Sequence, residues 1–233
     1  MADSGNWAGA SIEVKDVDKN SLAIKKAEAT WVVPRICLPP GGNLQDDYYL
    51  ATWVGFSGNC SSALLQAGTN VELKADGSMQ AKGWVEWYPQ GAEFKYNILI
   101  NPGDTVTVTV EAISNSVGRA TIENKNNGMK IVETVQSNNP SNSNTVLCNG
   151  PGIAYAFIEK TGKSTNALPR FNSVIFKDFE VTTSKSSQSV NLDDQHAALC
   201  DMNGKDASAT AERASKIGFN VDSGKGVCTK DSK

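Results

Sequence analysis

The residues with the most evident chemical potential lie in a short aromatic segment that contains one carboxylate. Glu86 stands among Trp84, Trp87 and Tyr88 in a run that is typical of a β-strand. Neighbouring aromatic rings keep water from a carboxyl group, which raises its pKa and lets it hydrogen-bond within a site. The sequence equally allows a simpler interpretation, in which Glu86 is a strand residue that faces solvent.

Trp53, Trp87 and Tyr88 are candidates for lining a substrate groove. Large aromatic side chains with a polar edge suit such surfaces. Each of the three has an alternative place in the core or on a plain sheet face. A noncatalytic sandwich protein, lectin-like or peptide-binding, would use the same aromatic surface, so these residues alone do not separate an enzyme from a binding protein.

Other hydrolytic chemistries have weaker support. The single histidine, His196, lies in a polar tail where a solvated side chain is the better expectation, and the chain has no GxSxG motif. A glycosidase needs two carboxylates across a groove. Glu86 with Glu93 or Glu111 are candidates, but their spacing does not single them out.

The cysteines favour disulfides over a metal site. The chain has five, none in a CxxC pair, and with one histidine it lacks the close ligand pairs of structural zinc sites. Widely spaced cysteines are typical of an oxidising compartment; buried, reduced cysteines in a cytosolic protein are the alternative. We expect a secreted protein, with Met1 replacing a removed leader, and no metal or organic cofactor.

The composition excludes several partners. The net charge is -3 and 20% of the 233 residues are charged, so the basic face that nucleic-acid binding needs is not indicated. No apolar run approaches the roughly 18–20 residues of a membrane span. We expect a monomer with no membrane or nucleic-acid partner.

Short strands separated by turn residues predict an all-β fold, an antiparallel two-sheet β-sandwich of the concanavalin-like or jelly-roll type. Residues 105–111 alternate valine with threonine or glutamate, and the preceding Asn101-Pro102-Gly103-Asp104 predicts a type II turn. The other predicted strands are 29–33, 51–56, 84–88, 130–135, 154–158 and 174–181.

The composition changes near residue 184. We expect residues 1–183 to form the sandwich and residues 184–233 to form a short C-terminal appendage. Alanines spaced through 206–217 predict a short helix, which Cys200 and Cys228 flank and could staple. A mostly disordered tail is the alternative.

Five motifs in order resemble the glutamic peptidases (eqolisins), acid endopeptidases with a two-sheet β-sandwich. The resemblance runs from about residue 4 to residue 183 and leaves the tail uncovered. Its motifs are SGNWAGA at 4–10, TWVVP at 30–34, TWVG at 52–55 followed by LQAG at 65–68, VEWYP at 85–89 and FNSVIF at 171–176.

The resemblance implies site residues and disulfides. Gln66 corresponds to the family's catalytic glutamine, whose side-chain amide polarises the peptide carbonyl; considered by itself, it is a surface glutamine in a turn. The family's disulfide implies a Cys60–Cys148 pair. Cys200 is then paired with Cys228, which leaves Cys37 unpaired.

The catalytic glutamate that the resemblance implies is missing. In the family it activates water for direct attack, without a covalent intermediate. If Tyr155 corresponds to the family's tryptophan, the catalytic position is Ala154, and we adopt this alignment. If the alignment is fixed on Glu159 instead, the catalytic position is Tyr155. Glu159 lies roughly 13–17 Å further along a strand and cannot substitute.

Two explanations account for the missing base: a glutamate engineered to Ala154, or a natural pseudo-peptidase. The local sequence match around Ala154 and the added-looking Met1 favour the first explanation. Ser57, Asn70 and Lys82 stand near places where the family usually has acidic residues, which favours the second. The sequence therefore predicts a glutamic-type acid endopeptidase that is inactive as written, with a noncatalytic binding protein as the alternative.

Overall fold

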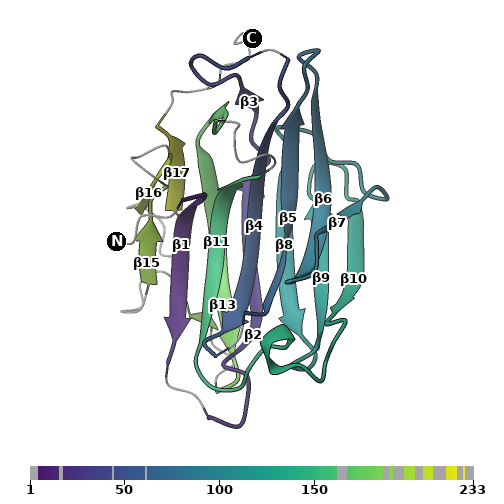
Figure 1. The fold of residues 1–233 in the computed structure, drawn as a ribbon, viewed down its shortest axis with the longest axis vertical. Helices are drawn as coiled ribbons and strands as arrows, with labels where there is room; N and C mark the ends of the chain where they lie inside the picture. The colour runs from purple at the N-terminus through teal and green to yellow at the C-terminus, as the bar shows by residue number, and fades with distance from the viewer. Residues whose placement is uncertain are drawn as a thin grey trace.

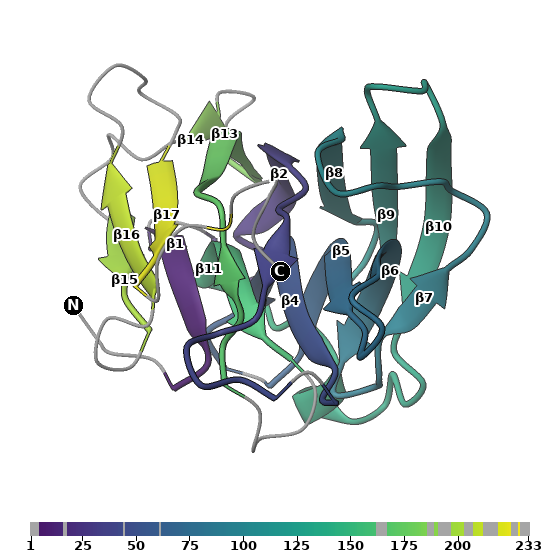
Figure 2. The ribbon, with the colours of Figure 1, turned by 90° about the horizontal axis from the view of Figure 1, so that it is seen from above.

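The chain folds into two antiparallel sheets that lie face to face, as seen from the side in Figure 1 and from above in Figure 2. The structure is a computed structural model, and it describes residues 5–15, 18–43, 45–60, 62–161, 167–185, 189–190, 197–202, 207–211, 219–224 and 228. The sandwich prediction is confirmed. The strands predicted from the sequence lie within observed strands, except that Val33 falls one residue beyond β2.

One sheet has seven strands in the order β15-β1-β11-β4-β5-β6-β7. Its outward face carries the candidate site residues described below. The bounds are β1 (Trp7–Val14), β4 (Tyr48–Gly58), β5 (Leu64–Leu73), β6 (Met79–Tyr88), β7 (Glu93–Lys95), β11 (Gly152–Lys160) and β15 (Ala197–Cys200).

The second sheet has eight strands, with β14 paired to β13 beside the main order β10-β9-β8-β2-β13-β17-β16. It closes the other side of the core. Its strands are β2 (Ile24–Val32), β8 (Thr105–Ala112), β9 (Val117–Asn124), β10 (Lys130–Gln136), β13 (Val174–Thr183), β14 (Ser189–Val190), β16 (Ala207–Ala211) and β17 (Phe219–Ser223). The remaining elements are the two-stranded sheet of β3 (Ile36–Cys37) and β12 (Arg170–Phe171) and the 3-10 helix η1 (Ser143–Thr145).

Alternation along each strand builds the core between the sheets. In β8, Val106, Val108 and Val110 are fully buried, while the threonines between them are partly exposed. Strands β4 and β5 are different because they are buried on both faces. Their inner faces meet the core, and an aromatic cluster covers the outer face. The central strands therefore give the site a rigid floor.

A buried polar contact links the two sheets across the core. Trp31 on β2 donates its indole N–H to the Thr69 hydroxyl on β5 at 3.2 Å, and its ring packs against Phe176 on β13. A buried indole needs such a partner, because an unpaired N–H in the core costs on the order of 1–3 kcal/mol. The contact holds β5, the strand of Gln66, against the second sheet.

The turn before β8 forms as predicted. Asp104 donates its backbone N–H to the Asn101 carbonyl at 3.0 Å. Gly103 has a φ of 103°, the left-handed conformation that a type II turn requires at its third residue. No helix among the described residues is long and apolar enough to cross a bilayer.

The tail does not contain the predicted helix over its described residues. Residues 207–211 form β16, which pairs with β17, and β17 pairs with β13. Strand β15 pairs with β1. These strands add to the open edges of both sheets, and Figure 2 shows them beside β1 and β13. Sheet edges offer unpaired backbone groups, which outweigh the helix propensity of scattered alanines. His196 lies outside the described residues.

The disulfides agree with one predicted pair and contradict the other. Cys60 is bonded to Cys148 as expected. Cys228 is bonded to Cys37 rather than to Cys200, so the predictions of a Cys200–Cys228 staple and of an unpaired Cys37 are wrong. The bond ties the end of the tail to β3. Cys200 instead lies on β15, opposite Gly9 of β1.

The Cys37–Cys228 bond closes a loop with a sequence separation of 191 residues, so it restricts the unfolded chain strongly. We expect Cys228→Ser to lower the free energy of unfolding by about 2–5 kcal/mol. Cys200→Ser is the matched control and should cost less than about 1 kcal/mol. Urea unfolding together with non-reducing peptide mapping measures both; equal losses in the two variants would instead indicate a Cys200–Cys228 pair.

Candidate active site

Four residues lie in one row across the outward face of the seven-stranded sheet. Tyr155 on β11 is opposite Gly55 on β4, Gly55 is opposite Gln66 on β5, and Gln66 is opposite Glu86 on β6. Residues directly opposite in a sheet share a face. A Cβ at Gly55 would come within 2.7 Å of the Gln66 Cβ, so only glycine leaves room there. Within the row, Gly55 is therefore a position without a side chain, and Tyr155 and Gln66 lie on either side of it.

Gln66 and Glu86 form a short side-chain hydrogen bond. The Gln66 Nε2 donates to the Glu86 carboxylate at 2.6 Å. Gln66 is only 6% exposed, and its Oε1 is buried with no hydrogen-bond partner among the described residues. Burial raises the pKa of Glu86, and the hydrogen bond from Gln66 partly opposes that rise. Burial is therefore the main cause of the raised pKa of Glu86.

A second carboxylate lies on the same face. Glu159 is four residues beyond Tyr155 on β11, and its Oε2 accepts a hydrogen bond from the Trp53 indole at 3.0 Å. Burial raises the pKa of Glu159 to about 7; the Trp53 hydrogen bond opposes the shift, and the charge of Glu86 adds to it. None of the ion pairs formed by the described residues includes either carboxylate.

A cavity of about 400 Å³ brings Gln66, Tyr155 and Glu159 together. Its aromatic wall is continuous: Trp53 meets Phe157 edge-on at 5.4 Å between ring centroids, and Phe157 lies 5.6 Å from Tyr155. Tyr155 also exchanges a hydrogen bond of 3.2 Å with the Ser57 hydroxyl. The lining residues are Trp7, Trp53, Ser57, Ser62, Leu64, Gln66, Tyr88, Tyr155, Phe157 and Glu159.

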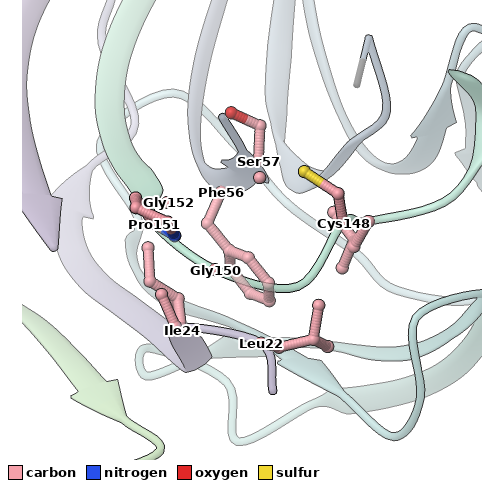
Figure 3. A pocket seen from close by; sticks show the side chains of 11 residues that line it. Leu22, Ile24, Phe56, Ser57, Cys148, Gly150, Pro151 and Gly152 are labelled. Carbon is pink, nitrogen blue, oxygen red and sulfur yellow. The ribbon is translucent and has the colours of Figure 1, made fainter. Parts of the chain in front are cut away.

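A separate small cleft behind this face cannot hold a substrate. It lies where β4 ends beside Cys148 and contains about 10 Å³, which is room for one water molecule. In Figure 3, Phe56 points toward Leu22 and Ile24 in this cleft, and Ser57 points away from them. Adjacent strand residues therefore separate the core side of β4 from the groove side.

Ala154, which the sequence predicted to occupy the catalytic position, does not line the groove. Ala154 is fully buried in the core, because it lies on the opposite face of β11 from Tyr155. A carboxylate there would be enclosed by apolar side chains and could not reach Gln66. The other alignment, anchored on Glu159, places Tyr155 at this position, and Tyr155 does lie in the row of Gln66.

The remaining predicted residues divide between groove and core. Gln66, Trp53 and Tyr88 line the cavity, and Glu86 is bonded to Gln66 at its edge. Trp87 does not line it: the side chain is 1% exposed in the core and donates its indole N–H to the Thr145 carbonyl. The two-residue period of strand β6 accounts for this difference, since Trp87 lies between Glu86 and Tyr88.

Sequence reasoning missed Glu159 as a groove residue. The available signal was the period of two along β11, which puts residues 155, 157 and 159 on one face. No group of three His, Cys, Asp or Glu in the described ranges could hold a metal ion. The site therefore offers an amide, two carboxylates with raised pKa values and an aromatic wall, which together suit a ligand that presents hydrogen-bonding groups along an extended backbone.

The raised pKa of Glu159 has a consequence for stability. Between about pH 4.5 and 7, the unfolded chain releases a proton that the native protein keeps, so the free energy of unfolding falls as pH rises through this window. Glu159→Gln keeps an acceptor for Trp53 but has no charge to bury. We expect this variant to avoid about 2–3 kcal/mol of the loss that the parent shows between pH 4.5 and 8. Urea unfolding across pH measures it.

The control is Glu111→Gln, which removes a half-exposed carboxylate on the other sheet. Its pH dependence should follow that of the parent. If Glu159→Gln also followed the parent, Glu159 would titrate as a solvated group and the description of its burial would be wrong.

Comparison with known proteins gives close relatives. The chain is 31% identical to aspergillopepsin-2 of Aspergillus niger over 201 residues, which is 79% of this chain and 66%, just under two thirds, of that protein. It is 31% identical to scytalidopepsin B of Scytalidium lignicola over 207 residues, 86% of this chain and 72% of that protein.

The fold agrees with these relatives. The crystal structure of scytalido-glutamic peptidase with a peptide-based transition state analog matches with a TM-score of 0.68 and 26% identity, over 95% of this chain and 100% of that one. Residues 5–221 match the Peptidase A4 family. The match includes much of the tail, which the motifs read from the sequence did not cover. This chain belongs to the Peptidase A4 family, the glutamic peptidases.

Proposed function

We propose that the groove binds extended peptides and that the chain as written does not cleave them by the family's water-attack mechanism, because Tyr155 occupies the position of the catalytic glutamate. The observation that carries the proposal is the row in which Tyr155 faces Gln66 across Gly55. The family's pair of glutamine and glutamate is here a pair of glutamine and tyrosine.

The chemistry of the row supports binding without turnover. Direct attack of water needs a proton acceptor and an oxyanion donor within reach of one carbonyl. Gln66 supplies an amide that can polarise a carbonyl. Tyr155 supplies a phenolic hydroxyl where this mechanism needs a carboxylate. Its hydroxyl is bonded to Ser57 instead.

The two remaining carboxylates do not replace the missing base. Glu86 accepts the Gln66 amide itself, so it holds the donor in place rather than facing a carbonyl bound to it. Glu159 is four residues from Tyr155 along the strand, about 13 Å at the rise of an extended chain. A water molecule activated at Glu159 would be too far from a carbonyl that Gln66 polarises.

Two further observations support a peptide ligand outside the cell. Scytalido-glutamic peptidase, which shares this fold, is solved with a peptide-based transition state analog. The two disulfides are consistent with an oxidising compartment, and we propose that the chain is extracellular.

Since Ala154 faces the core, the missing base does not call for an engineered change at that residue.

We expect Tyr155→Glu to gain peptide cleavage at acidic pH, because it returns a carboxylate to the row of Gln66. A general base contributes about 10²–10⁴-fold, so the rate should rise by that order over the parent. Adding Gln66→Ala to Tyr155→Glu should remove the gain. Cleavage of an internally quenched peptide between pH 2 and 6 measures both.

Ala154→Glu is the matched control. It adds the same carboxylate one residue away, on the core face, and should lower the free energy of unfolding by about 3 kcal/mol or more without any cleavage. Cleavage by Ala154→Glu, or a folded but inert Tyr155→Glu, would show that Tyr155 does not stand at the catalytic position.

A further inference from the structure

Glu159 lies in the aromatic end of the groove. Trp7 on β1 is directly opposite Glu159 on β11, and Phe157 is the next residue of β11 on the same face. The Trp7 and Phe157 rings are stacked at 24° with centroids 6.5 Å apart, and Trp53 approaches Phe157 edge-on. Trp7 remains 41% exposed, so this end is open to a ligand.

The charge of Glu159 is not balanced within the described part of the chain. Its hydrogen-bond donor is the neutral indole of Trp53, which reaches one carboxylate oxygen. The charged group that acts on it across the groove is Glu86 of β6, which is also negative. A buried carboxylate without a cation is costly unless it is protonated or receives a cation from outside.

The same cavity contains a second acceptor that lacks a donor. Gln66 is more than nine-tenths buried, and its Oε1 has no partner among the described residues. The groove therefore presents more hydrogen-bond acceptors than it can satisfy. A ligand rich in N–H groups complements it, and a hydroxyl-bearing ligand would leave the charge of Glu159 unbalanced.

We propose that the pocket formed by Glu159, Trp7, Trp53 and Phe157 is a subsite for a cationic side chain, lysine or arginine, of the bound peptide. The proposal rests on the proposed peptide-binding function of the groove. An ammonium or guanidinium group pairs with the carboxylate and lies against ring faces, and its methylene stem packs on the aromatic wall. A bare divalent metal is a poorer fit, because no cluster of three metal-binding side chains occurs in the described residues.

The test is a lysine scan. Hexapeptides that carry one lysine at each position in turn, on a neutral background with norleucine, are titrated against the parent at pH 8 while tryptophan fluorescence is recorded. We expect one lysine position to bind about tenfold or more tightly than the norleucine peptide. Glu159→Gln should remove this preference, so that the lysine and norleucine peptides bind to the variant equally.

Glu111→Gln controls for net charge, since it removes a carboxylate from the other sheet and should keep the preference. Lowering the pH from 8 to 5 should also abolish the preference, because protons and the cation compete for Glu159, whose charged neighbour in the groove is Glu86. Circular dichroism shows whether each variant is folded.

The outcomes separate the two proposals. If the neutral peptide binds and no lysine position improves on it, the groove binds peptides but the cation subsite is wrong. A lysine preference that survives Glu159→Gln also overturns the subsite, since the cation then binds elsewhere. If no hexapeptide binds to the folded parent, both the peptide-binding function and the subsite are wrong.

Discussion

Burial of one face of the seven-stranded sheet against the second sheet decides which residues can reach the groove. Along β11, Ala154, Ala156 and Ile158 are fully buried in the core, so Tyr155, Phe157 and Glu159 must face outward. A shift of one residue would exchange the two sets and put a carboxylate and two aromatic rings into the core. The same constraint on β5 and β6 brings Gln66 and Glu86 to the groove and sends Trp87 inward.

The floor of the groove depends on positions without a side chain. Gly55 separates Tyr155 from Gln66, and a Cβ at Gly68 would come within 2.7 Å of the Trp53 Cβ. These glycines let the Trp53 indole lie across the central strands and reach Glu159. The two carboxylates are then held by neutral donors, an amide and an indole, within an apolar wall. Neutral donors orient a carboxylate but leave its charge uncompensated, which is why the groove keeps protons or takes up cations.

The sequence alone predicts the strands and the sandwich because alternation and turn residues are local signals. Residues 105–111 and the turn at 101–104 are clear examples. It also identifies Gln66, whose flanking motif is strong. The local sequence pattern could not decide whether Ala154 or Tyr155 faces the groove. Ala154 is small and apolar and Tyr155 is aromatic, and either type suits both faces of a sheet. The sheet register, in which Tyr155 pairs with Gly55, is what places Tyr155 in the row of Gln66 and Ala154 in the core.

The tail and the cysteines were mispredicted for a different physical reason. Alanine-rich segments have helix propensity, but the open edges of β1 and β13 provide backbone partners that no local pattern records. The Cys37–Cys228 bond joins residues 191 apart, and such a pairing follows from where the tail ends rather than from spacing. The sequence analysis rejected Glu159 as a substitute base because of its distance along the strand from the catalytic position. That distance does not tell whether Glu159 is buried in the groove.

In the function proposed above, Tyr155 and Ser57 act as one coupled pair. Their hydroxyls satisfy each other at 3.2 Å, so the phenol lies in the row of Gln66 without an unpaired hydroxyl. Residues in direct contact rarely contribute independently.

The Gln66–Glu86 pair beside them is intact, although holding a carboxylate in this apolar setting is unfavourable. A groove that had lost all function would gain stability by replacing Glu86 with an apolar residue, whereas a groove that still orients Gln66 toward a ligand carbonyl needs this acceptor. The retained Gln66–Glu86 pair therefore supports the proposal that the groove binds a peptide.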